Sequence, residues 1–262
     1  MSDVVPLLVA QDSRGVVGLT LNRPLAYNAL SEAMIAALQS ALDAVATDPS
    51  ARVVVIAGAG KVFCAGHDLK EMRAAPALGY YERLFSALGR AMLTIQRLPV
   101  PVIARVHGMA TAAGCQLVAS CDLAVAAADA RFAVSGVNLG LFCSSPGVAL
   151  ARNLPRKAAF EMLVTGEFID AEAACARGLV NRVAAPDALD AEVERLVAAI
   201  VAKPQAAVAA GKGLFYRQLE SGIDAAYADA VRTMACNMMD PSALEGVQAF
   251  IDKRPPAWRG AN

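Results

Sequence analysis

Two short glycine-containing segments carry residue types with which a protein can stabilise negative charge on an oxygen atom. Residues 62–68, Val-Phe-Cys-Ala-Gly-His-Asp, follow an apolar strand pattern at 53–57 and open a helical pattern at Leu69. Residues 108–114, Gly-Met-Ala-Thr-Ala-Ala-Gly, follow a second strand pattern at 101–106. Small residues allow a tight turn from strand into helix, where the first backbone N–H groups lack intrahelical acceptors. Two such turns predict an oxyanion hole with two N–H donors.

The composition restricts the classes of partner. With 262 residues the chain can form one large domain, or a domain with an appendage. Its formal net charge is zero, so we expect no attraction to nucleic acid or to an anionic membrane. No apolar run approaches the ~20 residues that span a bilayer. The first six residues, Met-Ser-Asp-Val-Val-Pro, lack the basic and apolar regions of a signal peptide, which predicts a cytoplasmic location.

The cysteines and histidines give no sign of a metal centre. No C-x-x-C pair and no zinc-ligand spacing occurs, and the chain has only two histidines. A free thiol in apolar surroundings behaves as a small hydrophobic side chain. We therefore expect neither a disulfide nor a metal site among Cys64, Cys115, Cys121, Cys143, Cys175 and Cys236.

The elements that must position the two turns alternate between strands and helices. A hairpin is predicted at residues 7–21, and further strands at residues 53–57, 102–106, 123–127, 132–134 and 180–184. Helices are predicted from Ser31 to about Asp48, from Asp68 onward, and at residues 80–98, 114–120 and 147–153. Asp68 and Glu71 have the spacing of a capping box. The pattern predicts an α/β spiral core at residues 1–198 and a helical region at residues 199–262.

These motifs together resemble the crotonase (enoyl-CoA hydratase/isomerase) superfamily. Residues 136–156 most resemble its divergent subgroup called enoyl-CoA hydratase domain-containing protein 3. The matching segments follow the family order and are residues 20–24, 28–30, 63–70, 107–116, 120–122, 163–166, 174–181 and 250–254.

The resemblance implies a fold, an assembly and a ligand. The fold is the crotonase (ClpP/crotonase-like) spiral of ββα units with a C-terminal helical trimerisation region, and the homotrimers can pair into hexamers. The ligand is an acyl-CoA thioester, with coenzyme A as part of the substrate and no separate cofactor. The two N–H groups that bind the thioester carbonyl map to His67 and Ala113. Coenzyme A contacts map to Arg23, Ala26, Ala65 and Lys70, and to Phe250 and Lys253, which in the family commonly belong to a neighbouring subunit.

Two positions depart from the family pattern. Hydratases of the family place and activate water with two glutamates, which align here with Gln116 and Gly136. An amide hydrogen-bonds but does not act as a general base, and glycine has no side chain. Because a positioned acid or base contributes ~10²–10⁴-fold in rate, efficient hydration is not expected.

Three hypotheses remain open from the sequence. The first is an enzyme of the hydratase/isomerase type that acts through an enolate held by His67 and Ala113. The second is an acyl-CoA hydrolase that uses Cys143, on a predicted loop with Ser144 and Ser145, or the imidazole of His67. In the competing interpretation Cys143 is packed and inert, and the His67 side chain points away from the ligand. The third is a non-catalytic acyl-CoA binding protein that lacks the acid–base pair.

Overall fold

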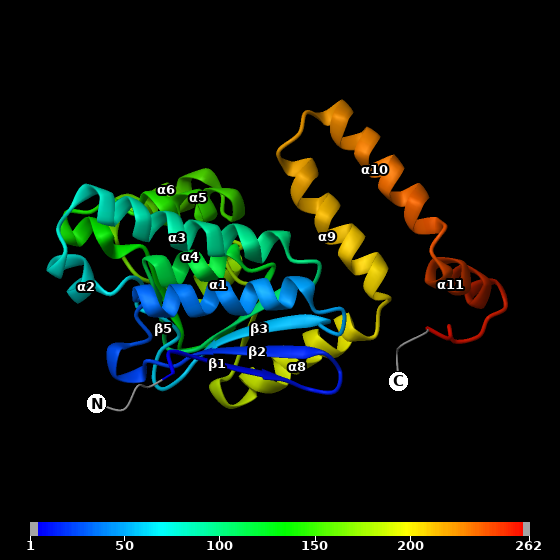
Figure 1. Ribbon diagram of the computed structural model, residues 1–262, viewed down its shortest axis with the longest axis horizontal. Helices are drawn as coiled ribbons and strands as arrows, with labels where there is room; N and C mark the ends of the chain where they lie inside the picture. The colour runs from blue at the N-terminus through cyan, green and yellow to red at the C-terminus, as the bar shows by residue number, and fades with distance from the viewer. Residues whose placement is uncertain (1–4, 259–262) are drawn as a thin grey trace.

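The computed structural model describes residues 5–258, and a six-stranded sheet forms its centre (Figure 1). The strand order is β1-β2-β3-β4-β6-β9, with only the β1–β2 hairpin antiparallel. A smaller sheet has the order β5-β7-β8. The strands are β1 (Leu7–Gln11), β2 (Val16–Leu21), β3 (Val53–Gly58), β4 (Val102–Val106), β5 (Met109–Thr111), β6 (Leu123–Ala127), β7 (Arg131–Ala133), β8 (Ile169–Asp170) and β9 (Arg182–Ala184).

Helices cover both faces of the large sheet. Along β3, Val54 and Ile56 belong to the main core with helices α1 and α3, whereas Val53 packs into a second core under α8. Because successive side chains of a strand point to opposite faces, a parallel sheet covered on both sides reads as the continuous apolar run seen here. The helices are α1 (Glu32–Thr47), α2 (Leu69–Ala74), α3 (Leu78–Arg97), α4 (Ala113–Ser120), α5 (Ser144–Asn153), α6 (Arg156–Thr165), α7 (Ala171–Ala176) and α8 (Leu189–Val201), with 3₁₀ turns η1 (Pro24–Ala26), η2 (Ser135–Leu139) and η3 (Pro186–Ala188).

The C-terminal helices project from this core (Figure 1). They are α9 (Gln205–Leu219), α10 (Ile223–Met238) and α11 (Pro241–Ile251), and α9 packs against α10. A buried polar cluster ties α9 to the core: Lys212 Nζ donates to Asp122 Oδ2 at 2.6 Å, and Tyr216 donates to Asp122 Oδ1 at 2.8 Å. The α/β core and the helical C-terminal part expected from the sequence are both present.

Two local predictions need correction. Helix α5 begins at Ser144 rather than at Gly147, so Ser144 and Ser145 lie in its first turn and not on a loop. Pro146 is the third residue of α5. Proline is tolerated in the first turn of a helix, because its missing N–H would have no intrahelical acceptor there. The capping box is only half formed: Asp68 accepts from the N–H groups of α2, but Glu71 Oε2 accepts from Glu32 N, at the start of α1.

Candidate active site

The first glycine turn leaves the N–H of His67 without an acceptor. Leu30 N donates to Gly66 O at 2.7 Å, and Asp68 N donates to Leu30 O at 3.2 Å. This parallel bridge uses the backbone groups on either side of His67, so the His67 N–H points away from Leu30. It donates to no group among residues 5–258.

The second glycine turn presents Ala113 as the first residue of α4. Its N–H belongs to the unpaired first turn of the helix and has no acceptor among the described residues. The preceding residue, Ala112, has φ 49° and ψ −117°, a conformation that is strained for any residue other than glycine. Its own N–H donates to Ala133 O at 2.9 Å, which holds the turn in place.

Gly66 allows the two turns to touch. A Cβ atom at this position would lie 3.0 Å from Ala112 Cβ and 3.1 Å from Ala113 N, and the residue has φ +91°. Only glycine meets both requirements without strain. The two free N–H groups are therefore held on adjacent turns of backbone.

A cavity of about 270 Å³ lies against both turns. It brings together five residues predicted from the sequence: Ala65, His67, Ala113, Gly136 and Cys143. Gln116 does not line this cavity; it is buried in α4, and its Oε1 atom has no hydrogen-bond partner among the described residues. The remaining walls come from the second glycine turn, α2, α3, η2, the segment before α5 and the first turn of α5. They are Leu69, Met72, Phe85, Ala112, Ser135, Leu139, Leu141, Phe142, Ser144, Ser145 and Pro146.

The imidazole of His67 is enclosed and uncharged. Its ring packs edge-on against Phe85, with centroids 5.2 Å apart, and its Nε2 atom is buried without a hydrogen-bond partner. Burial lowers the pKa of His67 from 6.5 to about 4, because the charged form loses its hydration. At neutral pH the ring is therefore neutral, and its buried Nε2 atom is not open to the cavity.

Cys143 is packed against Gly136. A Cβ atom at position 136 would lie 2.6 Å from Cys143 Sγ and 2.5 Å from Leu141 O. Burial raises the pKa of the Cys143 thiol, and this outweighs the opposing effect of a hydrogen bond with the Gly136 backbone. The thiol is therefore protonated at neutral pH, whereas the thiolate is the nucleophilic form.

The predicted coenzyme A residues lie in two separate places. Arg23 pairs with Asp68 at 2.9 Å and donates to Ala29 O at 2.8 Å, so it also fixes the loop beside the first turn. Ala26 ends η1, and Lys70 is exposed on α2. Phe250 and Lys253 are exposed at the end of α11, which lies at the opposite end of the molecule from α2 (Figure 1). One chain does not bring these two groups together.

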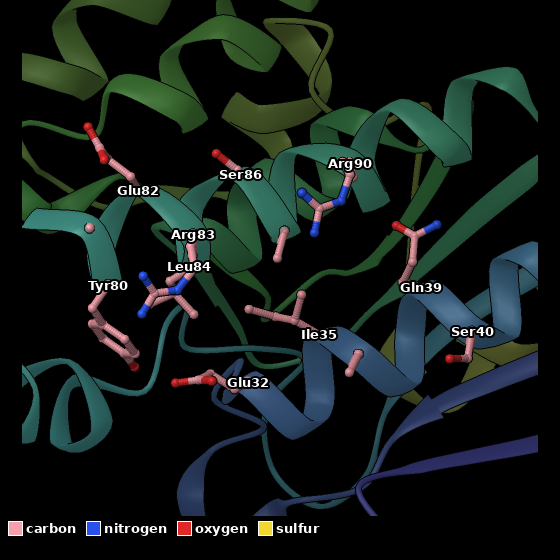
Figure 2. A pocket seen from close by; sticks show the side chains of 13 residues that line it. Glu32, Ile35, Gln39, Ser40, Tyr80, Glu82, Arg83, Leu84, Ser86 and Arg90 are labelled. Carbon is pink, nitrogen blue, oxygen red and sulfur yellow. The ribbon is translucent and has the colours of Figure 1, made fainter.

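A larger hollow, of about 910 Å³, lies between α1 and α3 (Figure 2). Arg83 and Arg90 extend over it from α3, and Glu32 and Gln39 line it from α1. None of the residues predicted from the sequence lines this hollow, and neither free N–H group belongs to its walls. The smaller apolar cavity is therefore the candidate active site.

Most residues of the cavity wall were not predicted from the sequence. Leu69 and Met72, on the helix predicted after Asp68, line the cavity. Phe85 and Phe142 carried no signal, because apolar residues on a long helix or before a helix also fit a core. Within residues 5–258, no helix is long and apolar enough to cross a membrane, and no cluster of three metal-binding side chains occurs.

Comparison with known proteins identifies the class of this fold and site. The family model described as enoyl-CoA hydratase/isomerase matches residues 11–261. A crystal structure of an enoyl-CoA hydratase from Mycobacterium smegmatis superposes with a TM-score of 0.96 at 70% identity, covering 97% of this chain and 98% of that one. The structure of human enoyl-CoA hydratase domain-containing protein 3 gives 0.93 at 43% identity, covering 97% and 100%. The fold is thus the crotonase fold expected from the sequence. The chain belongs to the enoyl-CoA hydratase/isomerase family.

The curated relatives contradict the expected cytoplasmic location. Enoyl-CoA hydratase domain-containing protein 3 of Xenopus laevis is 47% identical over 97% of this chain and 86% of the relative. It and four further vertebrate relatives, at 41–44% identity, are named as mitochondrial proteins. The expectation was a default that rested on the absence of a signal-peptide pattern, which is not evidence for a compartment. Residues 1–4 of that segment lie outside the described part of the chain.

Proposed function

We propose that this protein binds an acyl-CoA thioester and stabilises its enolate with the backbone N–H groups of His67 and Ala113. One observation carries the proposal: both N–H groups lack acceptors among the described residues, and both residues line one apolar cavity. Two fixed donors stabilise a carbonyl oxygen as it becomes an oxyanion, and they are most effective where water is excluded.

The proposed reaction is slow addition of water to an enoyl-CoA. No aspartate or glutamate lines the cavity among the described residues, so water lacks the usual base. Each missing acid or base lowers the rate by ~10²–10⁴-fold. Coenzyme A enters only as part of the substrate, and the proposal requires no separate cofactor.

Non-catalytic acyl-CoA binding is the second candidate. It is favoured by the packing at Gly136, where a side chain would meet Leu141 O at 2.5 Å, so a carboxylate has no room. Hydrolysis by Cys143 is disfavoured by its raised pKa, and hydrolysis by His67 by its enclosed Nε2 atom.

We also propose a homotrimer, which can pair into a hexamer through two trimers. We propose that residues 1–198 of each subunit form the core and that residues 199–262 form the assembly region. The C-terminal helices expose large apolar side chains that a partner subunit would cover: Phe215, Leu219, Tyr227, Val231, Met234 and Phe250. Coenzyme A would contact Arg23, Ala26, Ala65 and Lys70 of one subunit, and Phe250 and Lys253 of its neighbour. Light scattering after gel filtration tests this assembly, and a monomer at micromolar concentration would contradict it.

The test of the proposed function separates binding from turnover. Conversion of crotonyl-CoA is followed by mass spectrometry, and the affinity for unreactive butyryl-CoA is measured by calorimetry. Ala113→Pro deletes one N–H at the first position of α4, where proline is accepted. Removing one oxyanion donor is expected to lower turnover ~10²–10³-fold.

A matched variant controls for damage to the fold. Ala206→Pro changes the first turn of α9, outside the cavity, and both variants are compared by melting temperature. Unchanged turnover in a folded Ala113→Pro variant would exclude the proposed oxyanion hole. Tight butyryl-CoA binding without any turnover in the native protein would favour the non-catalytic candidate.

A further inference from the structure

The walls of the candidate active site carry no charge. Its larger side chains are apolar and are contributed by α2, α3 and the segment from η2 to α5: Leu69, Met72, Phe85, Leu139, Leu141 and Phe142. No lysine, arginine, aspartate or glutamate lines it among the described residues. His67 is neutral because burial lowers its pKa to about 4. An acyl group that ends in a carboxylate would therefore lose its hydration without gaining a partner.

The volume of the cavity limits the length of the acyl group. An apolar cavity of ~150 Å³ accepts benzene, which has six non-hydrogen atoms. At that packing, the cavity of about 270 Å³ accepts roughly ten or eleven such atoms. The thioester sulfur and carbonyl oxygen use two of them. About eight acyl carbons remain.

Phe85 lines the cavity from α3 and begins a row of aromatic contacts along that helix. Phe85 packs edge-on against His67, with 5.2 Å between the ring centroids, and stacks on Tyr81, with 6.2 Å between the centroids. Tyr81 in turn contacts Tyr80 at 5.7 Å. Tyr80 lines the hollow between α1 and α3 shown in Figure 2. Phe85 is the ring of this row that lines the cavity.

The outer wall is different, because its apolar side chains are largely exposed. Leu139 is 68% exposed, and Leu141 and Phe142 are 47% and 46% exposed. Phe85, by contrast, is half-buried and packs against the main core. Phe85 is therefore a fixed part of the cavity wall, and it contacts the residue whose N–H would hold the carbonyl.

We infer that Phe85 sets the length limit of the site, which accepts uncharged acyl groups of up to about eight carbons and rejects those ending in a carboxylate. The inference rests on the proposed function, since it assumes that the acyl group of a thioester occupies this cavity. Removing the Phe85 ring enlarges the cavity. It would then accept about six further non-hydrogen atoms, the number in the lost ring.

The test measures the affinity of the folded protein for saturated CoA thioesters, which bind without reacting. The probes are butyryl-, octanoyl-, dodecanoyl- and adipoyl-CoA. Octanoyl-CoA is expected to bind at least tenfold more tightly than dodecanoyl-CoA, and at least tenfold more tightly than adipoyl-CoA. In Phe85→Ala, the affinity for dodecanoyl-CoA should increase at least tenfold relative to that for octanoyl-CoA, whereas adipoyl-CoA should still bind weakly.

Two further variants control for loss of folding and for the loss of an aromatic ring outside the cavity. Phe85→Leu keeps most of the bulk of the side chain, so it should fold even if Phe85→Ala does not. It should retain the native preference for octanoyl-CoA over dodecanoyl-CoA. Phe160→Ala removes an exposed ring on α6 outside the cavity, and it should change no affinity ratio. Equal affinity of the native protein for octanoyl- and dodecanoyl-CoA would overturn the length limit, and tight adipoyl-CoA binding would overturn the charge limit. If no thioester binds, the proposed function itself fails.

Discussion

Gly136 and Cys143 occupy space that cannot hold both the native thiol and a side chain at position 136. A Cβ atom on Gly136 would lie 2.6 Å from Cys143 Sγ, and it would also lie 2.5 Å from Leu141 O. The second contact is with backbone, so trimming Cys143 alone does not make room. The backbone of the segment before α5 therefore leaves no room for a glutamate side chain at position 136.

Gly136→Ala is expected to destabilise the protein by about 1–3 kcal/mol, because an added methyl group must displace well-packed atoms. Gly89→Ala is the matched control. Gly89 lies within α3, and its Cβ would meet nothing within 4 Å, so alanine should stabilise the helix by about 0.5–1 kcal/mol. Urea unfolding measures both changes. Equal effects of the two variants would contradict the packing at Gly136.

Ala112→Gly is expected to raise stability by up to about 1 kcal/mol. Alanine at φ 49° and ψ −117° is strained, and glycine adopts this conformation without the clash of a Cβ atom. Ala33→Gly, at an exposed position of α1, should instead cost about 1 kcal/mol. The two changes are chemically identical, so a loss of stability in both would show that Ala112 is not strained.

The stability of the native protein should fall as the pH falls from about 6.5 to about 4. Burial depresses the pKa of His67 to about 4 in the folded state, while the unfolded chain binds a proton near 6.5. Between these values the unfolded state holds the extra proton, so acid favours unfolding. At about 1.4 kcal/mol per pKa unit the loss reaches roughly 3 kcal/mol.

His67→Gln should remove this part of the pH dependence, because glutamine does not titrate. Chemical unfolding at pH 7, 5 and 4 measures the difference between the variant and the native protein. A constant difference across this range would mean that the imidazole is solvated rather than enclosed beside Phe85.

Lys212→Met is expected to cost about 3–5 kcal/mol, because it leaves Asp122 without its charged partner. The native ammonium also donates to Ile95 O at 2.8 Å and to Val100 O at 2.9 Å, which would lose their partner. Lys157→Met, at an exposed position on α6, should stay within about 0.5 kcal/mol. Thermal unfolding of both variants provides the measurement, and a small effect of Lys212→Met would argue against the cluster as the tie between α9 and the core.

Much of this fold could be predicted because local pattern and final structure agree. The strand at residues 102–106 has the predicted bounds, and α1 ends within two residues of the prediction. The short strands β5 and β8 were missed, because two or three residues show no periodicity. Glu71 could not be assigned to Glu32 from spacing, since these residues meet only after α1 and α2 pack together.

The candidate site was predictable in its backbone and not in its side chains. The two small-residue turns after strands predicted two N–H donors, and the family resemblance assigned these donors to His67 and Ala113. The orientation of the His67 ring depends on Phe85, eighteen positions along the chain, and nothing near His67 indicates that contact. The packing of Cys143 on Gly136 is likewise invisible, because it depends on where α5 begins.

The most direct test of the central claim is infrared spectroscopy of butyryl-CoA carrying a ¹³C-labelled thioester carbonyl, measured free and bound to the native protein. Two N–H donors at His67 and Ala113 would polarise the carbonyl. The account therefore predicts a shift of its stretching band to lower frequency, reduced in Ala113→Pro. A bound ligand whose carbonyl band stays at the frequency found in water, in both proteins, would contradict it.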